Sequence, residues 1–378
     1  MSVAGLVTVG VAALASVFMA WAIGAGSSGS TPFAPAVGAN AISVMRAGFL
    51  VGILGFAGAV LQGANVSETV GTGLIGDVTL TPLAVVTILT IAASLVAVGV
   101  FAGYPIATAF TVTGAVVGVG LAMGGTPAWA AYREIVALWV VVPFVGGGVA
   151  YATARTLRSA ENDRLTIPAL GAIVGAIVAN IRFAALGDDG ARSIAQTLAD
   201  ATGGPGLVLV GGSSVALGLA VAGLLYWDVD REPVAGMRHF LLAMGGLVAF
   251  SAGGSQVGLA VGPLLPLLGD AVPLGLILLG GGLGLLVGSW TGATRMIKAI
   301  AQDYSSLGPR RSISALIPAF VLAQVAVFMG VPVSFNEIVV SAIMGSGLAV
   351  EGWGGVSGSK MGYTALAWVG SLLLALGV

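Results

Sequence analysis

The sequence predicts an all-α polytopic membrane protein built from two inverted repeats, with broken helices and re-entrant or short Pro-led hairpins. Three observations predict this class: the composition, a pair of repeated motifs, and the charge of corresponding loops. Of the 378 residues, 57% are hydrophobic and only 8% are charged, and the mean hydropathy is +1.07. Soluble domains carry about 25% charged residues. The chain therefore belongs to the membrane class.

The apolar segments are long enough to supply many spans, since a spanning helix needs about 20 residues. In order, they cover 3–24, 33–63, 82–103, 105–124, 134–154, 166–186, 205–227, 239–268, 271–290, 312–330, 332–350 and 362–378. The first stretch, Val3 to Ile23, has no charged leading region and no small-residue cleavage pattern, so we expect a retained helix.

The charged and metal-binding residue types exclude several function classes. The net charge is −1, so nothing predicts a nucleic-acid partner. One His and no Cys leave little material for a metal site or for thiol chemistry. With no Ser-His pair and no metal cluster in the pattern, we expect neither an enzyme nor a bound cofactor.

One segment of the chain occurs twice. Residues 105–122 and 332–349 both begin with Pro and end with Gly-x-Gly-Leu-Ala, and seven of their eighteen positions are identical. Each segment has about 18 residues, so it can re-enter the membrane or cross it. Matched irregular elements in two halves are typical of transporters whose site lies between the repeats.

A Gly/Ser-rich break is also repeated. The first break covers residues 24–35 and the second covers residues 251–263, so that Ser27 matches Ser255. Ser30 followed by Thr31 and Pro32 predicts a helix start in the first break. Two interpretations remain. Small residues allow close helix packing, whereas a broken helix exposes N–H groups that bind an anion. The register between the two breaks favours the anion site.

Loop charge indicates that the two halves are inverted. Residues 65–81 contain no Lys or Arg, whereas the corresponding residues 295–311 contain four. Because basic loops stay on the cytoplasmic side, the equivalent loops are expected on opposite faces. The predicted organisation is a first repeat at 1–130, linking transmembrane helices and loops at 131–237, and a second, inverted repeat at 238–378.

The candidate site residues are the polar side chains of these segments. The expected substrate-binding residues are Ser27, Ser28, Ser30, Thr31, Ser255, Gln256, Thr108, Ser334 and Asn336. The expected coupling-ion residues are Glu68, Glu337 and Asn65. An acidic residue in a membrane segment is a functional candidate. Two structural alternatives stay open: Ser334 and Glu337 fit a capping box, and Glu68 can be a carboxylate at a loop end in water.

The same residues resemble the inorganic phosphate transporter (PiT) family of cation-coupled symporters, across both halves. Residues 63–73, Gly-Ala-Asn-Val-Ser-Glu-Thr-Val-Gly-Thr-Gly, are similar to a family stretch that ends in Glu-Thr-Ile-Gly-Lys-Gly. The Pro-led segments are similar to its doubled Pro-Val-Ser-Thr-Thr-His element. The two breaks take the place of its doubled Gly-Ala-Asn-Asp-Val-Ala-Asn motif.

The chain also departs from this family at the residues that matter most. Where the family has Asn-Asp, the chain has Gly26-Ser27 and Ser255-Gln256, and Phe110 and Glu337 replace the His. The resemblance implies roles for the aspartates in sodium and phosphate binding, so their replacement leaves both coupling and substrate open. The motif pattern is closest to the family's sulfate-permease branch. A site without Asp suits sulfate, which only accepts hydrogen bonds at neutral pH.

The function expected from the sequence is secondary transport in the cell membrane by a multi-pass protein. The substrate is an inorganic tetrahedral oxyanion, phosphate by family resemblance or sulfate by the departures. Symport with Na⁺ or H⁺ is expected because each charge moved costs about 2.3 kcal/mol per 100 mV. The alternative is a passive anion channel of the same architecture. The other expected partner is membrane lipid, and assembly into a homo-oligomer stays open.

Overall fold

The computed structural model describes residues 3–159, 163–183, 186, 192–203, 206–268 and 271–377. The helices are α1 Val3–Gly26, α2 Ala34–Gly38, α3 Val44–Gln62, α4 Ala64–Thr72, α5 Pro82–Ala102, α6 Thr108–Ala122, α7 Trp129–Ser159, α8 Asp163–Ala179, α9 Ile194–Thr202, α10 Gly206–Arg231, α11 Pro233–Val261, α12 Leu265–Leu268, α13 Leu274–Asp303, α14 Pro309–Met329, α15 Phe335–Glu351 and α16 Gly358–Leu376. Two short 3₁₀ turns, η2 Gly262–Leu264 and η4 Gly352–Gly355, join them. The strands pair as β1 Ile75–Gly76 with β2 Thr126–Pro127 and as β3 Arg182–Phe183 with β4 Arg192–Ser193.

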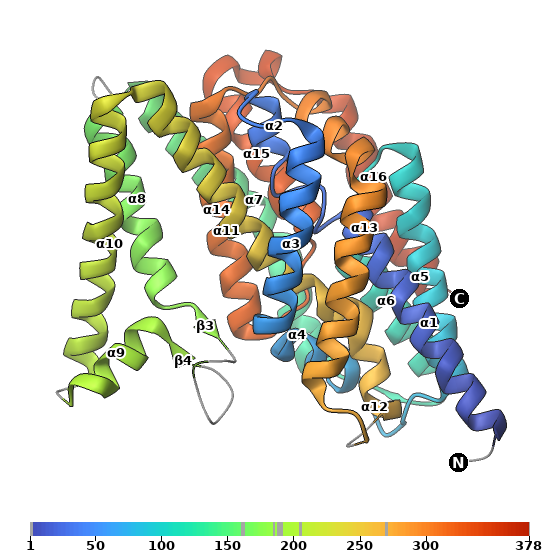
Figure 1. The fold of residues 1–378 in the computed structure, drawn as a ribbon. Helices are drawn as coiled ribbons and strands as arrows, with labels where there is room; N and C mark the ends of the chain where they lie inside the picture. Colours follow the sequence, from blue (N-terminus) through green and yellow to red (C-terminus); the bar gives the residue numbers. More distant parts are fainter. Residues whose placement is uncertain are drawn as a thin grey trace.

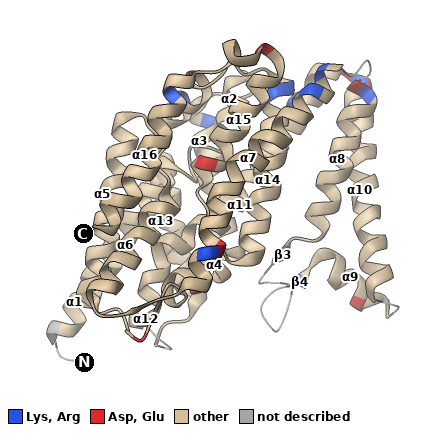
Figure 2. Ribbon diagram, turned by 180° about the vertical axis from the view of Figure 1, so that it is seen from behind, with Lys and Arg blue, Asp and Glu red and all other residues tan. Residues whose placement is uncertain are grey.

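Within the described residues, nine helices are long and apolar enough to cross a membrane. The predicted all-α polytopic fold is confirmed. In Figure 2 the Lys and Arg residues gather at one end of the helices, where α11 and α14 begin. The exceptions are Arg133, Arg182 and Arg192, which belong to the starts of α7, β3 and β4. By the positive-inside rule, we assign the Arg-rich end to the cytoplasm and the other end to the exterior.

The helices of the two halves correspond in pairs and run in opposite directions. α1 packs against α13, and its counterpart α11 packs against α3. Likewise α5 packs against α6 and α14 packs against α15. In Figure 1, α1 starts from the end that carries the N-terminus, whereas α11 starts from the opposite end. These opposed directions are those of an inverted repeat.

The two Pro-led segments are built in the same way. α5 ends at Gly103 with φ 75°, and α14 ends at Gly330 with φ 68°, a left-handed conformation that favours glycine. An extended stretch that contains Pro105 or Pro332 follows each glycine, and then α6 or α15 begins. Each segment therefore turns back into the bundle before its helix starts.

Each extended stretch accepts a hydrogen bond from a tryptophan. That tryptophan lies on the helix that follows the Pro-led segment of the other half. Trp139 on α7 donates its Nε1–H to the Pro332 carbonyl at 2.9 Å, and Trp368 on α16 donates to the Pro105 carbonyl at 2.7 Å. Correspondingly, α7 packs against α15 and α16 packs against α6. The helix that follows each Pro-led segment therefore packs against the Pro-led segment of the other half. On this matching, α7 corresponds to α16, although the sequence places α7 with the linking helices.

The second break predicted at residues 251–263 is not irregular through most of its length. α11 continues as a regular helix to Val261, and the chain turns only at η2. The glycines here allow close contact with α3 and α4. A Cβ at Gly253 would lie 1.8 Å from the Gly55 carbonyl, and one at Gly258 would lie 2.6 Å from the Ser67 nitrogen. For these glycines, the packing interpretation is correct.

The first break is irregular as predicted, but its helix does not start at Ser30. Residues 27–33 form turns, and α2 begins at Ala34 with no side-chain cap. The hydroxyls of Ser30 and Thr31 donate backward to the Ser27 carbonyl, at 3.2 and 3.0 Å. They therefore close the turn instead of capping the following helix.

Candidate functional site

Gln256 joins polar groups from both halves in the middle of the apolar bundle. Its Oε1 accepts hydrogen bonds from Thr108 Oγ1 at 2.7 Å and Ser27 Oγ at 3.3 Å. Its Nε2 donates to the Val333 carbonyl at 2.8 Å and to Ser255 Oγ at 3.3 Å. All four of these polar side chains are fully buried. The end of α1, the start of α6, α11 and the segment before α15 therefore meet at one amide.

The start of α15 adds a second set of contacts to this cluster. Asn336 donates from Nδ2 to the Gly26 carbonyl at 2.9 Å and to the Ile106 carbonyl at 2.6 Å. Ser334 caps α15 by accepting from the Glu337 backbone N–H at 3.4 Å. Glu337 is 2% exposed, and its Oε2 has no hydrogen-bond partner in the described structure. The carboxylate half of the predicted capping box is thus not formed, which leaves a buried acceptor.

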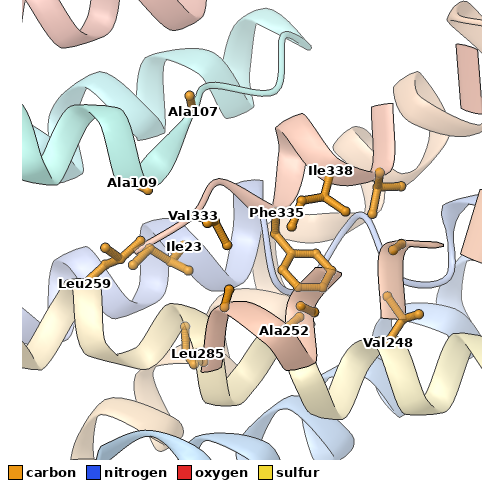
Figure 3. Packing of buried hydrophobic residues seen from close by; sticks show 14 of the residues in the cluster. Ile23, Ala107, Ala109, Val248, Ala252, Leu259, Leu285, Val333, Phe335 and Ile338 are labelled. Carbon is orange, nitrogen blue, oxygen red and sulfur yellow. The ribbon is translucent and has the colours of Figure 1, made fainter. Parts of the chain in front are cut away.

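Apolar side chains enclose these polar groups. Figure 3 shows Ile23 of α1, Ala252 of α11 and Phe335 of α15 around the extended stretch that carries Val333. Ala107 and Ala109 flank Thr108 from the other half. Because these polar groups are fully buried, hydrogen bonds and helix-end dipoles are stronger here than at a surface.

Most of the predicted substrate-binding residues lie in or beside this cluster. Ser27, Ser255, Gln256, Thr108 and Asn336 are joined through the contacts above, and Ser334 caps the helix that carries Asn336. The remaining three, Ser28, Ser30 and Thr31, are buried in the turn after α1. The Ser30 and Thr31 hydroxyls are already used within that turn.

Two of the predicted coupling-ion residues lie elsewhere. Glu68 and Asn65 are exposed on α4, whereas the cluster is buried. The Asn65 amide donates to the Val327 carbonyl of α14 at 3.3 Å. Among the described residues, Glu68 makes no side-chain hydrogen bond or ion pair. Of the three coupling candidates, only Glu337 lies at the start of the helix that contacts the cluster, and its side chain lines a separate cavity beside Phe110 and Trp139.

Several polar residues that extend the cluster were not predicted. Ser251 lies one turn before Ser255 on α11 and accepts from Gln324 Nε2 at 2.6 Å. Gln324 in turn exchanges hydrogen bonds with Gln62, at 3.3 and 3.4 Å. Gln62 and Gln324 could not be recognised as a pair from the sequence, because a single amide in an apolar helix forms no motif and the two residues lie 262 positions apart. The one signal in the sequence was their unusual polarity within a membrane segment.

The electrostatics of the cluster come from dipoles and not from basic side chains. Neither Lys nor Arg is among the cluster residues named above. α6 and α15 both begin at the cluster, and the first N–H groups of a helix have no partner within it. Those groups, with the positive dipole end, favour a bound anion. Among the described residues, no group of three or more His, Cys, Asp or Glu side chains is placed to hold a metal ion.

Comparisons with known proteins agree with this architecture. The sequence model described as the phosphate transporter family matches residues 23–378. The chain is 27% identical over 356 residues to a Thermococcus kodakarensis protein whose name describes a phosphate permease, covering 88% of this chain and 86% of that protein. It is 26% identical to the chloroplastic inorganic phosphate transporter 2-1 of Arabidopsis thaliana, covering 88% of this chain and 64% of that protein.

A solved structure shares the fold. The protein described as the sodium-dependent phosphate transporter superposes with a TM-score of 0.76 at 23% identity, covering 98% of this chain and 95% of that one. These names are of transporters and permeases. Nothing in the comparisons supports the predicted likeness to a sulfate-permease branch. Because the family model spans most of the sequence, the chain belongs to the phosphate transporter family.

Proposed function

We propose that this member of the phosphate transporter family carries inorganic phosphate across the cell membrane by cation-coupled symport. The observation that carries the proposal is the buried amide of Gln256, which joins hydroxyls from both halves. Such a cluster at the meeting point of inverted repeats is where transporters bind substrate. The names of the relatives supply the choice of phosphate.

Phosphate would be held by neutral donors and helix N-termini. The proposed substrate-binding residues remain Ser27, Ser28, Ser30, Thr31, Ser255, Gln256, Thr108, Ser334 and Asn336. Hydrogen phosphate also donates one hydrogen bond, which sulfate at neutral pH cannot do. Asn336 Oδ1 is a buried acceptor without a partner in the described structure. This acceptor favours phosphate over sulfate.

Glu337 is the proposed carrier of the coupling charge. A buried carboxylate without a cation partner is costly, so binding of Na⁺ or H⁺ beside the anion would offset the charge of both. The solved relative, which is described as a sodium-dependent phosphate transporter, supports Na⁺. Glu68 and Asn65 on exposed α4 are secondary candidates for a site nearer the exterior. Movement of one repeat, 1–130 or 238–378, against the other would expose the cluster to each side in turn.

The test is uptake of labelled phosphate into proteoliposomes, with an imposed sodium gradient, an imposed pH gradient, or neither. Accumulation above the equilibrium level that an ionophore abolishes is the expected result. Flux that only runs downhill would instead identify the passive anion channel. Unlabelled sulfate is added as a competitor, and we expect much weaker inhibition than with unlabelled phosphate. Saturable uptake of neither anion would contradict the proposal.

A further inference from the structure

A cavity of about 630 Å³ lies between the external ends of α3, α8 and α14, apart from the cluster. Most of its lining is apolar, and its polar members are Gln62, Asn65, Asn180, Arg182 and Gln324. In Figure 1, α8 stands apart from the main bundle on this side and meets it near β3.

Arg182 supplies a positive charge at the mouth of this cavity. Its guanidinium lies 4.7 Å from the centre of the Phe328 ring, and no carboxylate of the described residues lies within ion-pairing distance of it. Of the two other basic residues at the external end, Arg192 is paired with Asp200 at 2.8 Å, and Arg133 is not part of the cavity. Arg182 is exposed at this mouth, and a positive charge beside a low-dielectric recess raises the local concentration of anions.

Hydrogen-bonded side chains lead from the cavity toward the cluster as far as Ser251. Gln62 Nε2 donates to the Arg182 carbonyl at 2.9 Å, and Gln62 exchanges hydrogen bonds with Gln324. Gln324 donates to Ser251, which precedes Ser255 by one helical turn and so shares its face of α11. Ser255 accepts from Gln256. Polar groups therefore lie along the path from the Arg182 backbone to Gln256, with one turn of α11 separating Ser251 from Ser255.

We propose that this cavity is the external vestibule through which an inorganic oxyanion reaches the cluster, with Arg182 attracting the anion and Gln62 and Gln324 donating to it on the way. The proposal rests on the proposed function, because it needs a transported oxyanion. The proposal predicts an effect on phosphate binding from one side of the membrane only. Arg182 governs binding from the exterior and has no part in binding from the cytoplasmic side.

The first test compares Arg182→Gln with Arg182→Lys in right-side-out membrane vesicles. For Arg182→Gln, the KM for external phosphate is expected to rise about tenfold at low ionic strength, with little change in the maximal rate, because a focusing charge acts on local concentration. Arg182→Lys keeps the charge and should stay within about twofold of the unchanged protein. The rise in KM should shrink at high salt.

Comparing uptake with efflux distinguishes a vestibule role of Arg182 from a purely structural role. Phosphate efflux, measured from the same vesicles after loading, should keep its KM for internal phosphate in Arg182→Gln, whereas its maximal rate should fall about tenfold, because a substitution cannot change the ratio of the two Vmax/KM values at a fixed driving force. A rise in both KM values, or a fall in both maximal rates with unchanged KM values, would overturn the proposal, since loss of folding or of general rigidity acts on both directions. If the unchanged protein transports no phosphate in either direction, the proposed function fails and the vestibule fails with it.

The second test uses the absence of cysteine from the sequence. A single Asn180→Cys substitution places a thiol in the cavity wall, and Ala201→Cys places one on exposed α9 outside the cavity. A membrane-impermeant thiol reagent applied outside should inhibit uptake by Asn180→Cys about tenfold or more, and phosphate should protect the thiol. The reagent should modify Ala201→Cys without inhibition. Full uptake by labelled Asn180→Cys would show that the anion enters elsewhere.

Discussion

The starts of α6 and α15 share one backbone design but carry different side chains. Both follow a left-handed glycine, both contain an extended Pro, and both accept a hydrogen bond from a tryptophan. At the corresponding positions, however, Phe110 in the first copy matches Glu337 in the second. The two copies therefore share the glycine, the proline and the tryptophan hydrogen bond that fix the backbone. The second copy carries most of the polar side chains.

Gln256 is where the two copies are joined, so its loss should have the largest effect. Gln256→Leu keeps the size of the side chain but leaves the Thr108 and Ser27 hydroxyls and the Val333 carbonyl without their partner. Each unpaired buried group costs about 1–3 kcal/mol, so uptake of phosphate should fall by about a hundredfold. The initial uptake rate in proteoliposomes measures this. Ser346→Ala, a buried serine whose hydroxyl bonds only within α15, is the matched control.

The contrast between Glu337 and Phe110 predicts the next largest effect. In Glu337→Gln, net uptake driven by a cation gradient should fall about tenfold or more, because the charge that balances the cation is gone. Exchange of internal for external phosphate, which needs no net cation movement, should stay within about twofold. Phe110→Leu should lower both activities equally. Equal loss of exchange and net uptake in Glu337→Gln would show that the carboxyl serves binding and not coupling.

The shared backbone design predicts equal effects for the two tryptophans. Trp139→Phe and Trp368→Phe each remove one buried N–H donor and leave a proline carbonyl unpaired. Each should lower the free energy of unfolding by about 1–3 kcal/mol. Chemical denaturation in detergent micelles measures the two values. A difference of more than about 1 kcal/mol would mean that the halves are not held by equivalent contacts.

The two left-handed glycines should differ slightly, and they give the smallest effect. Gly103→Ala meets no atom within 4 Å, so it should cost only the backbone strain of about 1–2 kcal/mol. At Gly330 a new Cβ would lie 3.2 Å from the Asn65 carbonyl and from Thr69 Oγ1. Gly330→Ala should therefore be the more destabilising, by a few degrees of melting temperature beyond Gly103→Ala. If Gly103→Ala lowered the melting temperature more than Gly330→Ala, the more tightly packed turn would be the one in the first copy.

The sequence predicts the repeated elements well where proline and glycine mark the backbone. The pairs Pro105 and Pro332, and Ser27 and Ser255, could be aligned because they lie at nearly constant offsets. The regular course of α11 through the second break could not be predicted, because Gly253 favours a break locally and is used instead for contact with Gly55. Gln62 and Gln324 were missed for a similar reason: only folding brings these residues together.

The exchange of α7 and α16 between the halves bears on the order in which the chain is completed. Trp139 is synthesised before Pro332, so the second Pro-led segment finds its donor already in the membrane. Pro105 must wait for Trp368, which follows it by 263 positions. If translation stopped before α16, the Pro105 carbonyl of the first half would lack its tryptophan donor. The Pro332 carbonyl of the second half would already be bound by Trp139. For this molecule, the first half to be made is the last to mature, and separately expressed halves should need each other to fold.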